Sequence, residues 1–457
     1  MPETARGIIG ALFAKQSETL AKPGLAARKL AIACLIAVLR EKRPLDDSFN
    51  RLALAQPHAG LAERDRAFAR AIALTALRRA GQIREVLAHF ITRPPAAPKG
   101  DLDEILLAAA AQLLFLRAAP HAVIDLTVDQ IKQDRAAARF SKLANAVLRR
   151  VAEDGPALLA SQDAARLNTP TWLFASWQAA YGEETAQRIA LAHLDEAPLD
   201  LTVKSSPQAW AERLNGVVLA GGTVRLRGEG RIEDLPGYGE GEWWVQDVAA
   251  ALPARLLGEV SGKAIADLCA APGGKTAQLA HAGANVIAVD VSRQRLGRLE
   301  ENLRRLRLDA NIVVADAATW QPDAPLDGVL LDAPCTATGT IRRNPDIAYL
   351  KSPADIEALS RVQTRLIENA ARMLKPGGIL IYCSCSLQPE EGRAQIDRLM
   401  ATGAPLRVEP IRPQDIGGHG EWLTHDGFLR TLPCHLQLSE PGLSGMDGFF
   451  AARLVKI

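Results

Sequence analysis

Apolar residues recur at steps of three and four along residues 25–155, which is the spacing of an amphipathic helix. The segment RPPAAPKGD, residues 93–101, interrupts this pattern with three prolines and a glycine. We therefore expect a bundle made only of helices in this part of the chain, with helical segments at residues 25–42, 63–90, 103–116, 121–133 and 141–154.

The pattern changes after Gly155. Residues 169–194 suggest a pair of helices, and three short segments that follow, PLDLTVK, GVVLA and TVRLRG, are typical of strands. A stretch rich in proline and glycine at residues 236–241 ends this part of the chain. The pattern predicts a small α+β module.

Strands and helices alternate from Trp243 onward, which indicates a doubly wound, mainly parallel sheet. The expected strands are KAIADL, NVIAVD, NIVVAD, DGVLLD and GGILIYCSCS. We therefore expect a multidomain protein in which residues 1–160 form the all-α bundle, residues 161–240 the small α+β connecting module, and residues 241–457 an α/β domain.

The composition excludes several classes of protein. The 457 residues are 48% hydrophobic, and 35 glycines and 27 prolines are near average usage, so the chain is neither collagen-like nor disordered. The longest apolar run, residues 105–116, is too short to span a bilayer, and no basic segment precedes an apolar signal stretch. We expect a cytoplasmic protein with no membrane partner. Six cysteines without a C-x-x-C pair predict neither a disulfide framework nor a metal site.

The charge is distributed unevenly. The net charge is +2, but residues 1–155 hold 24 basic and 16 acidic residues, so the remainder of the chain is acidic. A polyanionic partner of the helical part and an ordinary solvated surface both account for this excess.

A loop that suits a ligand follows the first strand of the α/β domain. Gly273 and Gly274 permit a tight turn, and Lys275 opens a helix whose first backbone N–H groups favour a negatively charged group. A phosphate-binding Walker loop requires glycine where Cys269 stands, and the dinucleotide pattern G-x-G-x-x-G is absent. Both of those ligand classes are therefore disfavoured.

The next three strands each end on an aspartate, at Asp290, Asp316 and Asp332. A carboxylate at the tip of the second strand can accept both hydroxyls of a ribose, so Asp290 points to an adenosine-type ligand. Ligands of this sheet class bind at the edge where the carboxyl ends of the strands meet. Each aspartate taken alone could instead be a helix cap.

Two cysteines follow the fourth and fifth strands, at Cys335 and Cys385. If these strands are neighbours, about 5 Å apart, both thiols face one cleft. The alternative is a pair of buried thiols or a disulfide. Cys383 alternates in direction with Ser384 and is expected to pack in the core, and the alternative for Cys269 is that it only lines its loop.

Five motifs together resemble one family. DLCAAPGGKT, DVS, DAPCTATGTIRRNPD, YCSCSLQPEE and GMDGFFAARL are similar to the motif set of the Sun-family (Fmu-type) S-adenosylmethionine-dependent RNA cytosine-C5 methyltransferases. NTPTWLFASWQAAYG resembles the small RNA-binding module of that family, and the amino-terminal helices with SKLANAVLRR are similar to the NusB antitermination family. The combination resembles the members that act on bacterial small-subunit (16S) ribosomal RNA.

The resemblance implies a Rossmann-like class I methyltransferase domain with S-adenosylmethionine as cofactor. In it, Asp290 holds the ribose, Asp316 lies near the adenine, and Asp332 lies between cofactor and target base. The remaining implied cofactor contacts are Cys269, Ala270, Ala271, Pro272, Gly273, Gly274 and Lys275.

The resemblance also implies covalent catalysis by a thiolate that adds to carbon 6 of cytosine and so activates carbon 5. Cys385 matches the position of the nucleophile and Cys335 that of a second thiol that assists release, with Asp332 as the third catalytic residue. The family usually has ATCS or STCS where this chain has CSCS, so Cys383 is an additional thiol.

The implied partner is ribosomal RNA, free or in an assembly intermediate, and we expect a monomer. The target base must leave its stack to be reached. Arg342 and Arg343 are candidates for phosphate contacts or for a solvated pair. Two alternatives stay open: the same reaction on transfer RNA, and a ribosome-assembly RNA-binding scaffold without catalysis.

Overall fold

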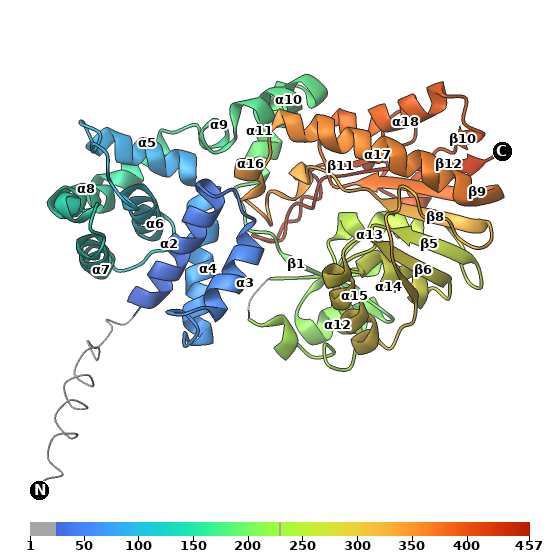
Figure 1. Cartoon of the computed structure of the whole chain (residues 1–457), viewed down its shortest axis with the longest axis horizontal. Coiled ribbons are helices and arrows are strands. Elements are labelled where there is room, and N and C mark those ends of the chain that lie inside the picture. Colours follow the sequence, from blue (N-terminus) through green and yellow to red (C-terminus); the bar gives the residue numbers. More distant parts are fainter. Residues whose placement is uncertain (1–23, 228–229) are drawn as a thin grey trace, which may run out of the picture. The chain divides into compact units, whose positions relative to one another are not determined.

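The computed structural model describes residues 24–227 and 230–457. It divides into two compact units, one that ends at Asn168 and one that begins at Thr169 (Figure 1). The division into three domains at residues 160 and 240 stays a prediction.

The first unit consists of helices in its described part, as the sequence predicts. The segment expected as one helix at residues 63–90 is two helices that meet at Arg79. The longest apolar run, which begins at Ile105, lies in the buried helix α6. In this helix Gln112 donates a hydrogen bond to the carbonyl of Ala108. The helices are α2 (Leu25–Leu39), α3 (Leu45–Leu54), α4 (Glu63–Arg78), α5 (Ala80–Phe90), α6 (Leu102–Leu114), α7 (Pro120–Gln133), α8 (Ser141–Ala160) and α9 (Ala164–Asn168).

The second unit begins with two helices and a small antiparallel sheet of order β2-β3-β1-β4. Trp243, expected to open the α/β domain, belongs instead to a strand that pairs with this small sheet, because its indole packs fully buried against Leu201 and Val224. The elements are α10 (Thr171–Tyr181), α11 (Glu183–Ala192), β1 (Leu199–Val203), α12 (Pro207–Leu214), β2 (Val217–Val218), β3 (Thr223–Leu226) and β4 (Trp243–Val245).

A larger sheet of order β10-β12-β9-β8-β5-β6-β7, with β11 beside β12, forms the rest of this unit. The strands from β9 to β7 run parallel, and β10, β11 and β12 are antiparallel to their neighbours. The strands are β5 (Ala264–Leu268), β6 (Asn285–Asp290), β7 (Asn311–Val314), β8 (Leu326–Asp332), β9 (Leu374–Ser384), β10 (Leu406–Val408), β11 (Leu429–Thr431) and β12 (Phe449–Lys456).

Helices cover both faces of this sheet (Figure 1). One apolar cluster joins Leu331 to α17 and α18, and a second joins Leu330 to α13 and α14. Both faces of the sheet are therefore shielded from solvent, which explains why the parallel strands are almost continuously apolar. The helices are α13 (Val248–Arg255), α14 (Gly274–His281), α15 (Arg293–Leu306), α16 (Ile347–Leu350), α17 (Pro353–Met373) and α18 (Arg393–Ala401). None of the helices in the described ranges is long and apolar enough to cross a membrane.

Candidate active site

The loop of residues 269–275 joins β5 to the first turn of α14, as predicted. Gly273 has a φ of 103°, and a Cβ added there would lie 2.8 Å from Cγ of Leu299. Only glycine fits this position, because both the backbone conformation and the space exclude a side chain. The loop therefore brings its backbone close to whatever binds beside it.

Asp267, which the sequence motifs did not point to as a site residue, lies in β5 just before this loop. Its side chain is buried, and Oδ2 accepts a hydrogen bond of 2.6 Å from the hydroxyl of Thr276. Oδ1 is buried and has no hydrogen-bond partner among the described residues, and Asp267 lines a cavity. Burial raises the pKa of Asp267 to about 7. The signal in the sequence was an acid one residue before the end of an otherwise apolar strand.

Asp290 ends β6 and is buried at the site where the sequence predicted it. Its carboxylate accepts hydrogen bonds from the backbone of Ala271 (3.2 Å) and of Ser292 (2.9 Å), and Arg295 lies 3.5 Å away. Asp316 lies two residues beyond the end of β7 and is exposed. The structure thus brings Asp290 to the ligand loop, whereas neither aspartate lines the cavity beside Asp267.

Lys275 and Asp332 form an ion pair inside the site. Nζ of Lys275 lies 2.7 Å from Oδ2 of Asp332, which ends β8. Burial alone would lower the pKa of Lys275, but the Asp332 carboxylate outweighs it, and the pKa lies above its ordinary value. The thiol of Cys383 lies 3.6 Å from the other oxygen, Oδ1. Cys383 is fully buried, as expected, and it also contacts a predicted catalytic residue.

The two predicted reactive cysteines lie together. Strands β8 and β9 are parallel neighbours, with Asp332 opposite Cys383 in register. The Sγ atoms of Cys335 and Cys385, just beyond the ends of these strands, are 3.4 Å apart, and both are free thiols. The hydrogen bond with Cys335, together with burial, raises the pKa of Cys385 well above its ordinary value. Cys385 is therefore protonated at rest.

Backbone contacts fix the loop that carries Cys335. The N–H of Gly339 donates to the carbonyl of Cys385 at 2.9 Å, and the N–H of Gly448 donates to the carbonyl of Gly339 at 2.9 Å. A Cβ on Gly339 would lie 2.1 Å from the Gly448 oxygen, so three backbone segments meet without side chains between them. The carboxy-terminal GMDG segment thus supports the site.

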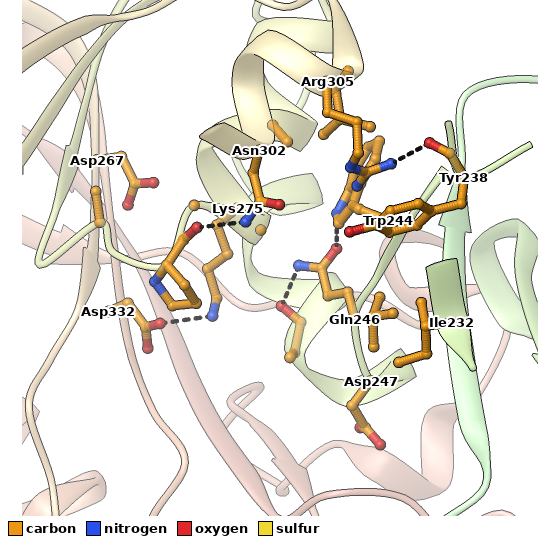
Figure 2. A pocket seen from close by; sticks show the side chains of 18 of the residues that line it. Ile232, Tyr238, Trp244, Gln246, Asp247, Asp267, Lys275, Asn302, Arg305 and Asp332 are labelled. Carbon is orange, nitrogen blue, oxygen red and sulfur yellow. Dashed lines mark hydrogen bonds and ion pairs between the residues drawn. The ribbon is translucent and has the colours of Figure 1, made fainter. Parts of the chain in front are cut away.

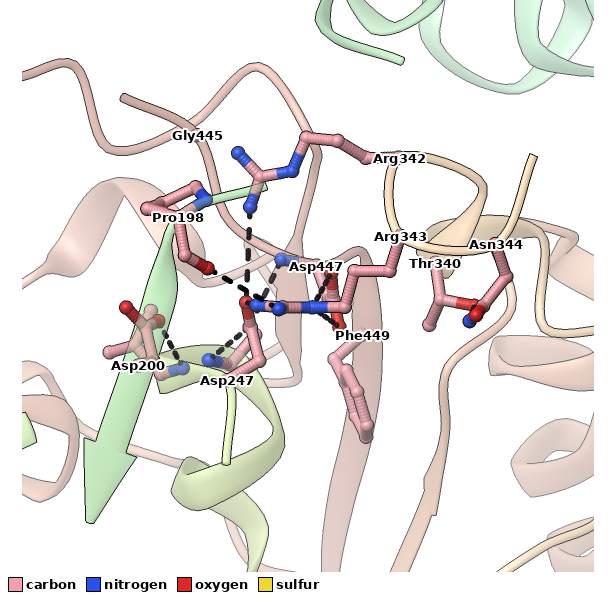
Figure 3. A network of polar contacts seen from close by, with 12 residues as sticks. Pro198, Asp200, Asp247, Thr340, Arg342, Arg343, Asn344, Gly445, Asp447 and Phe449 are labelled. Atoms are coloured by element: carbon pink, nitrogen blue, oxygen red, sulfur yellow. Dashed lines mark hydrogen bonds and ion pairs between the residues drawn. The ribbon is translucent and has the colours of Figure 1, made fainter. Parts of the chain in front are cut away.

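Arg342 and Arg343 belong to a buried network of polar contacts (Figure 3). Nε of Arg343 donates to both carboxylate oxygens of Asp447 at 3.1 Å, and Arg343 also bonds Asp247. Arg342 is 1% exposed and donates to the carbonyl of Ser444. Burial raises the pKa of Asp447 to about 6, although Arg343 opposes the rise. Arg342 therefore serves the interior of the fold, which corrects its interpretation as a phosphate contact or a solvated residue. Arg343 is 24% exposed and lines a cavity, so a phosphate contact of Arg343 stays a prediction.

A cavity of about 430 Å³ lies beside the loop and reaches Lys275 and Asp332 (Figure 2). Trp244 and Gln246, from β4 and the residues after it, form another wall, where the indole N–H donates to Oε1 of Gln246 at 2.9 Å. The cavity thus combines charged groups from the large sheet with an aromatic wall from the small sheet. The part of the chain that the structure describes holds no group of three or more His, Cys, Asp or Glu side chains arranged to bind a metal ion.

Two family models match the chain. The model described as 16S rRNA methyltransferase RsmB/F matches residues 254–455, and the NusB family model matches residues 25–153. A ribosomal RNA small subunit methyltransferase B of Cronobacter sakazakii is 34% identical over 87% of this chain and 92% of its own. A protein of the same name from Xanthomonas campestris pv. campestris is 34% identical over 95% of this chain and 98% of its own.

Solved structures share the fold. The crystal structure of PH0851 covers 95% of this chain and 99% of its own, with a TM-score of 0.72 and 22% identity. NSun6 from Pyrococcus horikoshii, solved with SFG, covers 63% of this chain and 98% of its own, with a TM-score of 0.53 and 21% identity. Both likenesses concern the fold alone.

Proposed function

This chain belongs to the family of 16S rRNA methyltransferases RsmB/F, and on that premise we propose that it transfers a methyl group from S-adenosylmethionine to carbon 5 of a cytosine in 16S ribosomal RNA. The observation that carries the assignment of residues is the pair of thiols, Cys335 and Cys385, 3.4 Å apart beside Asp332. Methyl transfer to an amino group or to a ribose oxygen would require no thiol, whereas carbon 5 of cytosine is unreactive until a nucleophile adds to carbon 6.

The residues around the loop fit S-adenosylmethionine. Asp267 lines the cavity and has a buried oxygen without a hydrogen-bond partner among the described residues, so its carboxylate can accept a hydrogen bond from the amino group of the cofactor. Gly273 allows close approach of the backbone, with Cys269, Ala270, Ala271, Pro272, Gly274 and Lys275 around it. Asp290 would hold the ribose and Asp316 the adenine. When bound, the cofactor supplies an electrophilic methyl group on a sulfonium.

Cys385 would act as the nucleophile. Its thiolate would form a bond to carbon 6 of the cytosine, and the electron pair displaced toward carbon 5 would then form the bond to the methyl group while the bond between that methyl group and the sulfonium sulfur breaks. Afterwards the proton of carbon 5 would pass to water, the electron pair of that C–H bond would re-form the double bond between carbons 5 and 6, and Cys385 would leave as a thiolate. Because Cys385 starts as a thiol, its proton would first pass to water as well.

Cys335 and Asp332 would assist these steps. The thiol of Cys335 lies at hydrogen-bond distance from Sγ of Cys385, so it can return a proton to the departing thiolate. Asp332 is fixed by Lys275 and by Cys383, so it presents a hydrogen-bond acceptor to the amino edge of cytosine.

The substrate would be an unstacked cytosine in small-subunit RNA, either free or in an assembly particle, and the protein a monomer of the cytoplasm. The experiment is methyl transfer from labelled S-adenosylmethionine to 16S RNA and to bulk transfer RNA, with bisulfite sequencing of the products. Label at a cytosine of 16S RNA that depends on Cys385 supports the proposal. Label only in transfer RNA would favour the first alternative, and no label in either RNA would favour an assembly scaffold.

A further inference from the structure

Glu391 is a buried carboxylate that the methyl-transfer chemistry does not use. It lies in the short 3-10 turn Pro389–Glu391 that follows β9, and it is 0% exposed. It does not line the cavity beside Lys275. Glu391 therefore cannot touch the RNA or the cofactor, and any influence on the reaction must pass through the residues that it holds.

The carboxylate of Glu391 holds the residue that follows Cys335. The backbone N–H of Thr336 donates to both carboxylate oxygens, at 2.9 and 3.2 Å, and the Thr336 hydroxyl donates as well. The amide of Gln363 donates to Oε1 at 3.1 Å and to the carbonyl of Pro334 at 2.9 Å. Both chain neighbours of Cys335 are thus held by one connected set of hydrogen bonds.

The same residue also holds the segment that carries Cys385. The hydroxyls of Ser384 and Tyr382 donate to the backbone carbonyl of Glu391 at 2.9 and 2.8 Å. Oγ of Ser386, the residue after Cys385, lies 3.2 Å from Oγ1 of Thr336. Glu391 therefore connects the segments of both thiols, through its carboxylate on one side and its main chain on the other.

We propose that Glu391 is a positioning residue that sets the spacing between the thiols of Cys335 and Cys385, and thereby the rate at which the methylated RNA is released. The effect on the release rate rests on the proposed function, whereas the effect on the spacing between the two thiols does not. Every group that bonds the carboxylate is a donor. Glu391→Gln places an NH2 group against donors, so at least one hydrogen bond is lost and the Thr336 segment must move.

The first test measures the spacing without any RNA. A bimane dithiol cross-linker becomes fluorescent only when it bridges two close thiols, and peptide mapping identifies the pair. We expect rapid bridging of Cys335 to Cys385 in the wild-type protein and in Glu390→Gln, the adjacent exposed glutamate, and about tenfold slower bridging in Glu391→Gln. Equal bridging rates in all three proteins would overturn the proposal.

The second test measures release of product. In Glu391→Gln we expect kcat to fall about 10- to 100-fold with little change in KM for RNA, and the trapped protein–RNA adduct to rise. A loss of folded protein alone would lower activity without raising the adduct per active molecule. An unchanged adduct fraction beside a lowered kcat would therefore contradict the positioning role.

Thr336→Val is a second variant that guards against failure to fold. It removes the hydroxyl that bonds Glu391 and Ser386 but keeps the backbone N–H. We expect slower bridging and a raised adduct, both smaller than in Glu391→Gln. Wild-type bridging in this variant would contradict the proposed connection. If the wild-type protein bridges but transfers no methyl group, the proposed function fails while the spacing role stands.

Discussion

The Sγ atoms of Cys335 and Cys385 lie 3.4 Å apart although the two residues are fifty positions apart in the chain. Their strands are parallel neighbours, and the register sets Asp332 opposite Cys383, so the loops beyond both strands start side by side. At this distance each thiol can exchange a proton with the other. The geometry therefore suits a nucleophile and a partner that later helps it to leave.

Single substitutions should separate the roles of the two thiols. With substrate RNA and S-adenosylmethionine, Cys335→Ala should accumulate a protein–RNA adduct that survives a denaturing gel, because release is impaired after the bond to carbon 6 has formed. Cys385→Ala should form no adduct and transfer no methyl group. Cys34→Ala is the control, since Cys34 is a free, fully buried thiol in α2, and this variant should transfer methyl groups and release its product as the wild type does. Equal trapping by the Cys335 and Cys385 variants would contradict the assignment.

The ion pair of Lys275 and Asp332 should matter for catalysis far more than a similar pair at the other end of the same strand. Lys275→Met leaves the Asp332 carboxylate without its cation, and we expect methyl transfer to fall about 100-fold, equivalent to roughly 2.7 kcal/mol. Steady-state assays with labelled methyl donor measure the effect.

Lys375→Met is the matched control, because Lys375 pairs with Asp327 near the start of β8 and is half-exposed. We expect less than a twofold change in rate, since an exposed ion pair contributes about 0–1 kcal/mol and touches no site residue. A comparable loss in both variants would show that Lys275 acts on stability and not on the reaction.

The sequence was sufficient to predict the strands of the large sheet and the acids and cysteines that follow them, because these depend on local pattern. Apolar strands, the glycines of the loop and the position of each acid or cysteine after a strand are all visible in one dimension. Trp243 was expected to open the α/β domain but belongs to a strand of the small sheet, since the pairing of a three-residue strand is decided by distant partners such as Leu201. Asp267 and Glu391 were not recognised as site residues, because their importance lies in burial and in long-range hydrogen bonds.

Arg225 and Asp200 should stabilise the second unit through a fully buried ion pair. Both side chains are 0% exposed, Nε of Arg225 lies 2.7 Å from Asp200, and Arg225 also donates to the carbonyls of Leu443 and Gly445. Arg225→Met leaves the buried Asp200 carboxylate without its cation, and we expect a loss of about 3–5 kcal/mol in the free energy of unfolding. Chemical denaturation followed by fluorescence measures it.

Arg227→Met provides the comparison two residues further on. Arg227 pairs with Glu440 at the surface, where both side chains are more than half exposed, so we expect a change of about 0–1 kcal/mol. If Arg225→Met and Arg227→Met unfold at the same denaturant concentration, the buried ion pair does not stabilise the second unit more than the exposed pair does.

Asp267 should make the stability of the ligand-free protein depend on pH. Burial raises its pKa from an ordinary 3.8 to about 7, so the folded state holds the proton more tightly than the unfolded state. The contribution of Asp267 to stability is therefore complete below pH 4 and is lost as the pH rises to about 7. Asp267→Asn carries no such charge, and it should be more stable than the wild type at pH 8 by a few kcal/mol, since one pKa unit corresponds to about 1.4 kcal/mol.

Denaturation of both proteins at a series of pH values tests this directly, and the difference in unfolding free energy should be small at pH 4 and reach its full size near pH 8. The same substitution should weaken binding of S-adenosylmethionine, because the buried oxygen that lacks a protein partner is then no longer a carboxylate. A more stable protein that binds its cofactor less well is the pattern expected when a charged group is kept for its ligand. A difference in unfolding free energy that does not change with pH would contradict the raised pKa of Asp267. Unchanged binding of S-adenosylmethionine would show that Asp267 serves only the fold.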